Sequence, residues 1–349
     1  MWRLALGLGL CLGLSACETP HPRPLSPPLS PPTAKAPVLI VPHGYAARLM
    51  AEGLEDPRAV AMGPNGGVYV VEGVPASLLR IDGNGSLVPV ATGGADDAWT
   101  GAAFVAGRFA VAGGGRILAL TAEGKRSTLV EGLPAATTIT LEAGPDGWLY
   151  AAVSSVAAGP AGPGRDIPCQ DLDLRPGGSV KGRVPCTNSV LRIAPDGATV
   201  EAFAWGFGRP VGLDFTADGR LMLAETGLLW AVTPGVWYGW PDYHGQMAMA
   251  DPLLAATPNP PPAPLAVLPG SARAMAVARG DEFGPPGEVF VALDDGTVAF
   301  IDSAGAPTPF VAGLRQPSAM AFSEDGAALW VADAGTGQLW RIEAVPGAP

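Results

Sequence analysis

Histidine and cysteine are scarce in this chain, which limits the chemistry that it can perform. The 349 residues include three histidines and four cysteines. A zinc site would need about four such ligands together, and no histidine lies near Cys169 and Cys186 in the sequence. The chain also lacks a GxSxG sequence, so nothing indicates a nucleophilic hydrolase of that type.

Basic residues and long hydrophobic runs are also few. Lysine and arginine number 21 against 32 aspartates and glutamates, a formal net charge of −11. A nucleic-acid partner would require clustered basic residues, so this class of partner is excluded. The apolar run from Leu4 to Leu14 is too short to span a bilayer, and no other segment approaches the length required.

The N-terminus has the order of features that export signals share. Arg3 precedes the apolar run, which ends in Leu14-Ser15-Ala16-Cys17. This string resembles the lipobox of bacterial lipoproteins, so we expect residues 1–16 to be a signal peptide and Cys17 to carry lipid. An ordinary signal peptide with an incidental Cys17 is the alternative. We therefore predict a protein of the cell envelope, on the extracytoplasmic side, that contacts the membrane through its lipid anchor only.

Proline dominates the next segment, residues 17–37. A run such as HPRPLSPPLSPPTAKAP cannot donate enough backbone hydrogen bonds for a sheet and favours an extended spacer. Residues 38–349 remain as the folded domain. Within it, Cys169 and Cys186 form an even pair in an oxidising compartment, and we predict a disulfide between them.

A repeat of strands and Gly-rich turns runs along this domain. Six copies begin at Asp56, Asp96, Ala136, Gly208, Ala272 and Arg315, roughly 40 residues apart where no insertion intervenes. This period predicts an all-β fold, a six-bladed β-propeller. We expect GYAARLMAEGL, from Gly44 to Leu54, to close the ring as the outer strand of the last blade. A β-sandwich or an open β-solenoid is the alternative.

Two insertions interrupt the repeat, at residues 149–188 and 234–265. Loops of this length usually form lids or binding walls. The string GFGRPVGLDFTADGRLMLAETG, which begins at Gly206, is followed ten residues later by WYGWPDYHG. These strings resemble the glucose/sorbosone dehydrogenase family, six-bladed propellers that use pyrroloquinoline quinone (PQQ) and calcium to oxidise sugars.

The resemblance implies a small sugar or alcohol as substrate and PQQ with calcium as cofactors. Arg209 would contact cofactor and substrate, and Thr226 the cofactor. Because aromatic faces suit sugar C–H groups, a stacking wall for a sugar or the cofactor could come from Trp237, Tyr238, Trp240 and Tyr243, with ordinary packing of the insertion against the blade as the alternative. Backbone carbonyls of Gly227 and Leu228 would bind calcium.

The chain departs from the family pattern at the catalytic positions. Gly208 and Arg209 stand where the family has adjacent arginine and asparagine. The family's histidine base is missing from AAVSSVAAG, residues 151–159, so His244 is the candidate substitute. Asp294 and Asp295 would repel an anionic cofactor. We therefore predict a degraded catalytic constellation and weak or absent PQQ-dependent glucose oxidation.

Two other functions remain open. One is a non-catalytic envelope propeller that binds a glycan or a protein partner. For each of these functions we expect a monomer. The other is a calcium-dependent lactonase, which would need acids and amides gathered at the channel; Glu72, Glu142, Asn188, Glu225 and Asp333 are scattered candidates.

Overall fold

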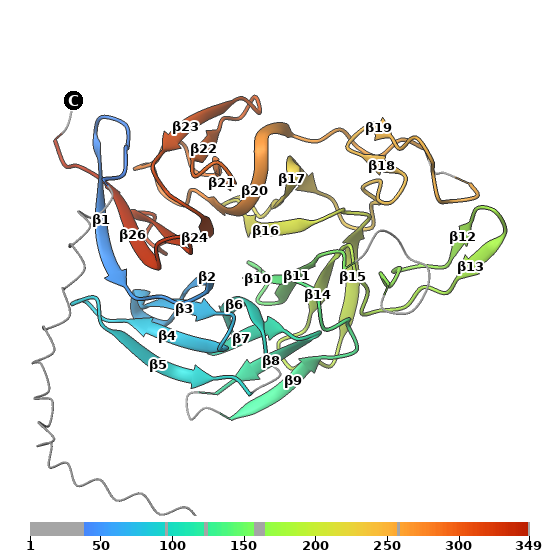
Figure 1. The fold of residues 1–349 in the computed structure, drawn as a ribbon, viewed down its shortest axis with the longest axis horizontal. Coiled ribbons are helices and arrows are strands. Elements are labelled where there is room, and N and C mark those ends of the chain that lie inside the picture. Colours follow the sequence, from blue (N-terminus) through green and yellow to red (C-terminus); the bar gives the residue numbers. More distant parts are fainter. Residues whose placement is uncertain (1–37, 95–96, 122–124, 157–164, 257–258, 348–349) are drawn as a thin grey trace, which may run out of the picture. The chain divides into compact units, whose positions relative to one another are not determined.

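Antiparallel β-sheets arranged around a central axis build the described part of the protein (Figure 1). The computed structural model describes residues 38–94, 97–121, 125–156, 165–256 and 259–347. The predicted signal peptide, Cys17 and the proline-rich segment lie outside the described residues. The one helical element of the described part is a short 3-10 turn, η1 (Pro64–Gly66). None of the described helices is long and apolar enough to cross a membrane.

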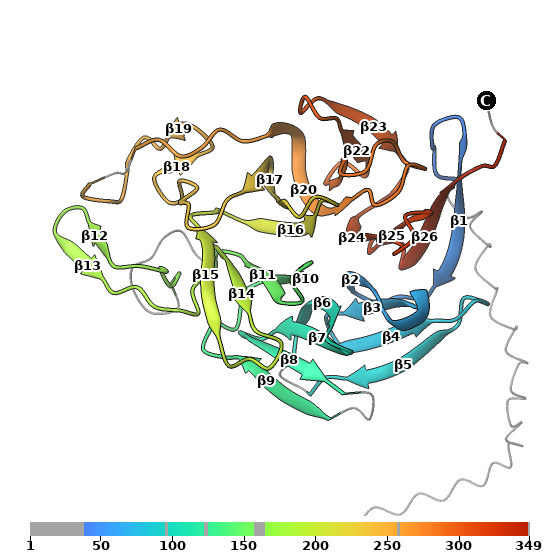
Figure 2. The same cartoon turned by 180° about the vertical axis from the view of Figure 1, so that it is seen from behind.

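Three four-stranded sheets follow one another along the chain. The first contains β2 (Pro57–Met62), β3 (Val68–Glu72), β4 (Ser77–Ile81) and β5 (Leu87–Thr92). The second contains β6 (Trp99–Val105), β7 (Arg108–Gly113), β8 (Arg116–Leu120) and β9 (Arg126–Val130). The third contains β10 (Ile139–Ala143), β11 (Leu149–Val153), β14 (Ser189–Ile193) and β15 (Val200–Trp205). In each sheet the first strand lies nearest the axis (Figures 1 and 2).

The fourth sheet has six strands and corrects the predicted number of blades. It contains β16 (Pro210–Phe215), β17 (Leu221–Val232), β20 (Ala266–Val277), β21 (Val289–Leu293), β22 (Val298–Ile301) and β23 (Pro307–Val311). Strand β20 pairs with β17 through its first residues and with β21 from Ala272 onward. Because this strand continues without a break, the copies that begin at Gly208 and Ala272 share one sheet. The propeller therefore has five blades, and the prediction of six was wrong.

The N-terminal strand closes the ring, as the sequence predicted. β1 (Tyr45–Glu52) pairs antiparallel with β26 (Gln338–Ala344), from Tyr45 opposite Ala344 to Glu52 opposite Gln338. The same sheet contains β24 (Pro317–Phe322) and β25 (Ala328–Asp333). A strand from each end of the domain thus shares one blade, which covers the edge that β26 would otherwise expose.

Each of the two insertions forms a short hairpin, and the insertions contact each other. β12 (Leu172–Leu174) pairs with β13 (Gly178–Val180), and β18 (Tyr243–His244) pairs with β19 (Met247–Ala248). Leu174 bridges to Leu254, which joins the first insertion to the second. Both hairpins extend from the same side of the ring (Figures 1 and 2). The disulfide Cys169–Cys186 constrains the first insertion, with Cα atoms 5.0 Å apart, and confirms that prediction.

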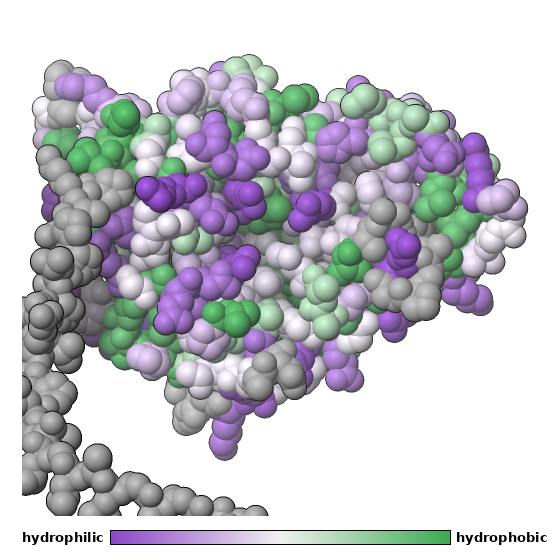
Figure 3. Space-filling model, in the orientation of Figure 1, coloured by the Kyte–Doolittle hydropathy of each residue, from purple (hydrophilic) through white to green (hydrophobic). Residues whose placement is uncertain are grey.

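Apolar side chains fill the spaces between neighbouring sheets. Buried valine, leucine, isoleucine and aromatic residues form clusters between blades, for example Val71, Leu78, Trp99 and Val111 between the first two. Near the axis, where the sheets converge, alanines replace larger residues, so the strands can approach one another. On the face drawn in Figure 3, hydrophilic side chains gather around the centre, and apolar residues are scattered rather than joined in one patch.

Candidate functional site

A cavity of about 500 Å3 lies where the inserted loops meet the ring. Its walls come from three neighbouring parts of the chain: the end of β11, the turn before β16, and the second insertion with the adjoining part of β17. The lining residues are Ser155, Val156, Gly208, Arg209, Glu225, Thr226, Trp240 and His244. Four residues that the sequence singled out, Arg209, Thr226, Trp240 and His244, are therefore brought together.

Glu225 is the acid of this cavity, and the fold uses both of its carboxylate oxygens. The residue is 3 % exposed. Its Oε2 accepts hydrogen bonds from the backbone N–H groups of Gly208 (2.6 Å) and Arg209 (3.2 Å), and its Oε1 accepts one from the Trp230 indole (2.8 Å). Burial raises the pKa of Glu225, although these hydrogen bonds oppose the shift. Glu225 therefore holds the turn before β16, and three of its roughly four lone-pair sites are used by the fold.

Equivalent contacts recur around the ring and show that the arrangement is structural. In each case a side chain near the end of a blade's second strand accepts backbone N–H groups from the segment that leads into its innermost strand. The pairs are Glu72 with Glu55, Ser154 with Thr138, and Asp333 with Arg315 and Gln316. In the six-stranded sheet Asp294, which follows β21, accepts the N–H of Ser271 in β20 in a similar way. Acids and hydroxyls at this position satisfy donors that would otherwise be buried without partners.

Arg209 and His244 are the groups of the cavity that the fold leaves for a ligand. Both side chains are exposed, and neither makes a hydrogen bond or an ion pair in the described part of the chain. His244 lies close to Gly227, where a Cβ atom would be 3.9 Å from the imidazole Nε2. Gly227 also has a φ of +76°, a conformation that glycine adopts without strain.

Trp240 of the predicted aromatic wall lines the cavity, and Tyr238 does not. Trp240 lines the cavity and packs over Gly208, where a Cβ atom would lie 3.6 Å from its ring. Tyr238 is instead 2 % exposed and stacks on Phe207, with ring centroids 4.6 Å apart. Its hydroxyl donates to the carbonyl of Ala231. Tyr238 is therefore a core residue beneath the cavity and does not line it.

The residues of the cavity do not fit PQQ well. Three carboxylates need cations, and Arg209 is the one permanently charged cation among the lining residues. Thr226 lies opposite Ser271 in the ladder, and the N–H of Ser271 donates to Asp294, so this acid stands close to the same wall. One arginine cannot offset three carboxylates, so an anionic cofactor would keep uncompensated negative charge here.

The described residues also offer few ligands for calcium. They contain no group of three or more His, Cys, Asp or Glu side chains that could hold a metal ion. Gly227 falls in a β-bulge and has no partner residue in the ladder, whereas Leu228 is back in register opposite Val267 and is buried. Calcium binding through these two carbonyls stays a prediction. Of the scattered lactonase candidates, Glu72, Glu225 and Asp333 serve in the structural contacts described above.

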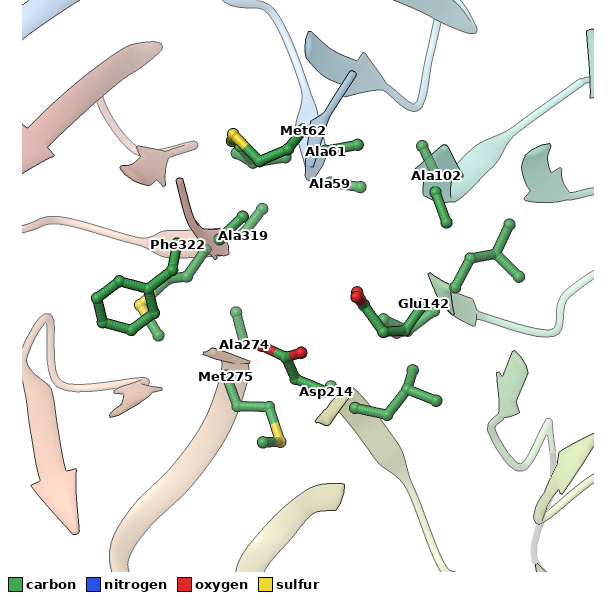
Figure 4. Close-up of a pocket in the computed structure, with 18 of the residues that line it drawn as sticks. Ala59, Ala61, Met62, Ala102, Glu142, Asp214, Ala274, Met275, Ala319 and Phe322 are labelled. Carbon is green, nitrogen blue, oxygen red and sulfur yellow. The ribbon is translucent and has the colours of Figure 1, made fainter. Parts of the chain in front are cut away.

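A second cavity, of about 190 Å3, occupies the central channel (Figure 4). Glu142 on β10 and Asp214 on β16 point into it from neighbouring blades. Arg279 donates to Asp214 at 3.0 Å and to Glu142 at 3.4 Å. Burial and the charge of Asp214 raise the pKa of Glu142 to about 8, although Arg279 opposes the shift.

The two cavities lie toward opposite ends of the innermost strands. Arg209 precedes the first residue of β16, whereas Asp214 is next to its last. Five residues of extended chain span roughly 15 Å. Sequence reasoning named Glu142 as a scattered candidate but did not identify its grouping with Asp214 and Arg279, although one signal was present. Where the copies are aligned on their turns, Glu142 and Asp214 occupy the position held by Ala61 and Ala321 in two other copies.

Comparisons with known proteins show a shared fold. No family model and no curated protein sequence matches the chain. The structure is similar to the PQQ-bound aldose sugar dehydrogenase of Streptomyces coelicolor, with 19% identity and a TM-score of 0.66 over 88% of this chain and 100% of that one. It is also similar to the calcium structure of a Trichoderma reesei carbohydrate-active enzyme of family AA12, with 15% identity and a TM-score of 0.62 over 88% and 98%.

A gluconolactonase of Xanthomonas campestris has the same general fold. It is 18% identical, with a TM-score of 0.58 over 90% of this chain and 96% of that one. Proteins with different activities therefore share this architecture with the chain. At such identities the likeness establishes a β-propeller of this type, and the function has to be argued from the site.

Proposed function

We propose that the protein binds a small sugar-like ligand in the cavity of Arg209, Trp240 and His244, and that it does not oxidise sugars efficiently with PQQ. One observation carries this proposal. Both carboxylate oxygens of Glu225, the acid of the cavity wall, accept hydrogen bonds from the fold. The groups that face a ligand are then the guanidinium of Arg209, the imidazole of His244 and the indole of Trp240. Such a set suits a hydroxylated ring.

The lining groups have complementary tasks in binding. The guanidinium of Arg209 is a planar donor that suits hydroxyl or carboxylate oxygens. The indole face of Trp240 packs against the C–H groups of a sugar ring. His244 can donate or accept a hydrogen bond at the same ligand. The sugar-dehydrogenase neighbours support a sugar as the ligand class, although they share the fold at low identity.

Oxidation of an alcohol carbon needs more than this cavity provides. A base has to take the hydroxyl proton as hydride leaves, and His244 is the one candidate among the lining residues. Ser154, where the family places its base, accepts the backbone N–H of Thr138 and is buried. The surroundings therefore favour binding over turnover. PQQ and calcium are ligands to be tested.

Binding can be measured directly by calorimetry with a panel of monosaccharides and the full-length protein. We expect Arg209→Ala and Trp240→Ala each to weaken sugar binding about tenfold, the loss of one charged hydrogen bond or one stacking surface. Arg220→Ala is the matched control, because Arg220 pairs with Asp218 at the turn between β16 and β17, at the end of β16 remote from Arg209. If Arg209→Ala and Trp240→Ala bound sugar as tightly as the control Arg220→Ala and wild type, the proposal would be contradicted.

We also propose that the protein is held at the cell envelope by lipid on Cys17. The support is the order of charge, apolar run and cysteine in residues 1–17. Cys17→Ser should release the protein from membranes or block its processing. Unchanged mass and unchanged membrane fractionation of this variant would refute the lipid anchor and leave the ligand proposal intact.

A further inference from the structure

The side chains that face the candidate cavity without partners are basic. Arg209 and His244 both line it, both are exposed, and neither makes a hydrogen bond or an ion pair in the described part of the chain. A guanidinium has five N–H donors and no acceptor, and a protonated imidazole nitrogen also donates. The ligand that completes this cavity therefore has to supply acceptors, and an ionised acceptor makes the strongest hydrogen bonds with an arginine.

An arginine without an acidic partner stands out in so acidic a protein. The chain has 32 aspartates and glutamates against 21 lysines and arginines. Several other arginines pair with acids, as Arg116 does with Asp97 at 2.6 Å. The backbone N–H of Arg209 donates to Oε2 of Glu225 at 3.2 Å, yet its guanidinium makes no ion pair with this or any other described acid. The charge of Arg209 is therefore free to pair with an acid of a ligand.

The acids close to the cavity already accept hydrogen bonds from the fold. Glu225 is the one acid among the lining residues, is 3 % exposed, and accepts three of them. Asp166 does not line the cavity, is buried, and accepts the Ser155 hydroxyl at 2.7 Å. Asp294 is separated from Thr226 by strand β20, and its carboxylate accepts a backbone N–H of that strand. Each acid is thus engaged by donors of the fold, whereas the guanidinium in the cavity is not.

The donors of the cavity suit a carboxylate better than a phosphate. Phosphate sites usually combine several backbone N–H groups, at a helix N-terminus or in a glycine-rich turn. The described part of the chain has one helical element, the 3-10 turn η1 of the first blade. The backbone N–H groups of Gly208 and Arg209 beside the cavity donate to Glu225. One planar guanidinium remains, and it matches the two oxygens of a carboxylate through parallel hydrogen bonds.

We propose that the ligand is a uronic acid, a sugar whose C6 carboxylate pairs with Arg209 and whose ring packs on the indole of Trp240. The cavity of about 500 Å3 accommodates one such sugar, since pockets for small ligands span about 300–1,000 Å3. His244 donates to a hydroxyl or to the carboxylate of the same sugar. One arginine matches one carboxylate, whereas the three carboxylates of PQQ exceed it. This inference rests on the proposed sugar-binding function and narrows its ligand class.

D-Glucuronate and D-glucose form a matched pair of probes, because they differ at C6 only. We expect the full-length protein to bind glucuronate about tenfold more tightly than glucose in calorimetry at pH 7, since a hydrogen bond between charged groups is stronger than one to a hydroxyl. D-Glucuronamide, the neutral amide of the same sugar, should bind like glucose. The preference for glucuronate should shrink when sodium chloride rises from about 0.05 M to about 0.5 M, because salt screens the ion pair.

Arg209→Gln tests whether the guanidinium causes this preference. The variant keeps an amide donor and removes the charge, so it should lower the affinity for glucuronate about thirtyfold and for glucose about threefold, which abolishes the preference. Its Tm should stay that of wild type, because the guanidinium has no partner in the described part of the fold. Arg220→Gln is the control with the same change of net charge, since Arg220 pairs with Asp218 at the other end of β16.

The possible outcomes separate the two proposals. Equal affinity of the wild-type protein for glucose and glucuronate would overturn the uronic acid assignment and leave sugar binding in place. A preference that survives in Arg209→Gln would also overturn it, as would tighter binding of glucose 6-phosphate, which carries a phosphate at the same carbon. If none of these sugars binds, the proposed function itself fails. Loss of the preference in Arg209→Gln, with Tm unchanged and Arg220→Gln like wild type, is the result that we expect.

Discussion

Glu225 and Glu142 are both acids enclosed by the propeller, and the comparison between them separates structure from function. Glu225 accepts three hydrogen bonds from the fold and is 3 % exposed. The Glu142 side chain is 27 % exposed to the channel and has one arginine nitrogen at 3.4 Å, shared with Asp214. The first acid stabilises a turn beside the candidate site. The negative charge of the second, Glu142, is balanced less well, because Arg279 is shared with Asp214.

The difference shows that an acid in a cavity wall is not by itself a functional group. A carboxylate that already accepts three hydrogen bonds from the fold, out of about four that it can accept, has little capacity left for a ligand. The side chains beside it that make no hydrogen bond or ion pair in the described part of the chain, Arg209 and His244, are the better guide to ligand chemistry.

Replacement of Glu225 should have the largest effect on stability. Glu225→Ala leaves three donors without an acceptor, and each costs about 1–3 kcal/mol, so we expect a loss of about 4 kcal/mol in the free energy of unfolding. Glu225→Gln should lose less, because its amide oxygen still accepts. Urea denaturation measures both, with Thr226→Ala as the neighbouring control. A loss below 1 kcal/mol for Glu225→Ala would show that Glu225 is not structural.

The crosslink beside the candidate site should have the next largest effect. The disulfide closes a loop of sequence separation 17, and its removal by Cys169→Ala with Cys186→Ala should cost about 3 kcal/mol in the chain-entropy model. Unchanged urea denaturation of the double variant would contradict this expectation.

Glu142 should control how stability depends on pH. The folded protein keeps this proton up to about pH 8, whereas the unfolded chain releases it near 4.5. The folded state therefore binds more protons in this window, and stability falls as pH rises from about 4.5 to 8. Glu142→Gln should flatten the fall and raise stability at pH 8 by up to about 2 kcal/mol. If the free energy of unfolding changed equally between pH 5 and pH 8 in the variant and in wild type, this prediction would be contradicted.

The same variant should leave ligand binding unchanged, which is the smallest effect expected. Glu142 lies toward the end of the channel remote from Arg209. Glu142→Gln should therefore bind sugar within twofold of wild type, whereas Arg209→Ala should lose about tenfold. Calorimetry at pH 7 tests both variants. If Glu142→Gln abolished binding, the channel and not the outer cavity would be the site.

Much of the fold could be predicted from local signals. The Gly-rich turns and apolar alternation placed most strands, and the pairing of β1 with β26 followed from the strand left over at the N-terminus. The number of blades could not be predicted in this way. A repeat shows where each copy begins, but it does not show that the last strand of one copy continues into the first strand of the next, as β20 does.

The candidate site was predictable in part for a similar reason. Motif positions identified Arg209, Trp240 and His244, which the structure brings to one cavity. The direction of a side chain from an irregular loop is not encoded in its spacing, so Tyr238 was assigned to the cavity and lies in the core. The pairing of Glu142 with Asp214 depends on contacts between blades, which a single strand does not reveal.

The central claim is that this propeller binds sugar without efficient PQQ-dependent oxidation. The most direct test adds PQQ and calcium to the full-length protein and follows dye reduction with glucose and glucuronate. We predict turnover no faster than a control with PQQ alone, in a preparation that binds sugar by calorimetry. Robust turnover that Arg209→Ala or His244→Ala abolishes would contradict the account and show that the cavity is an intact dehydrogenase site.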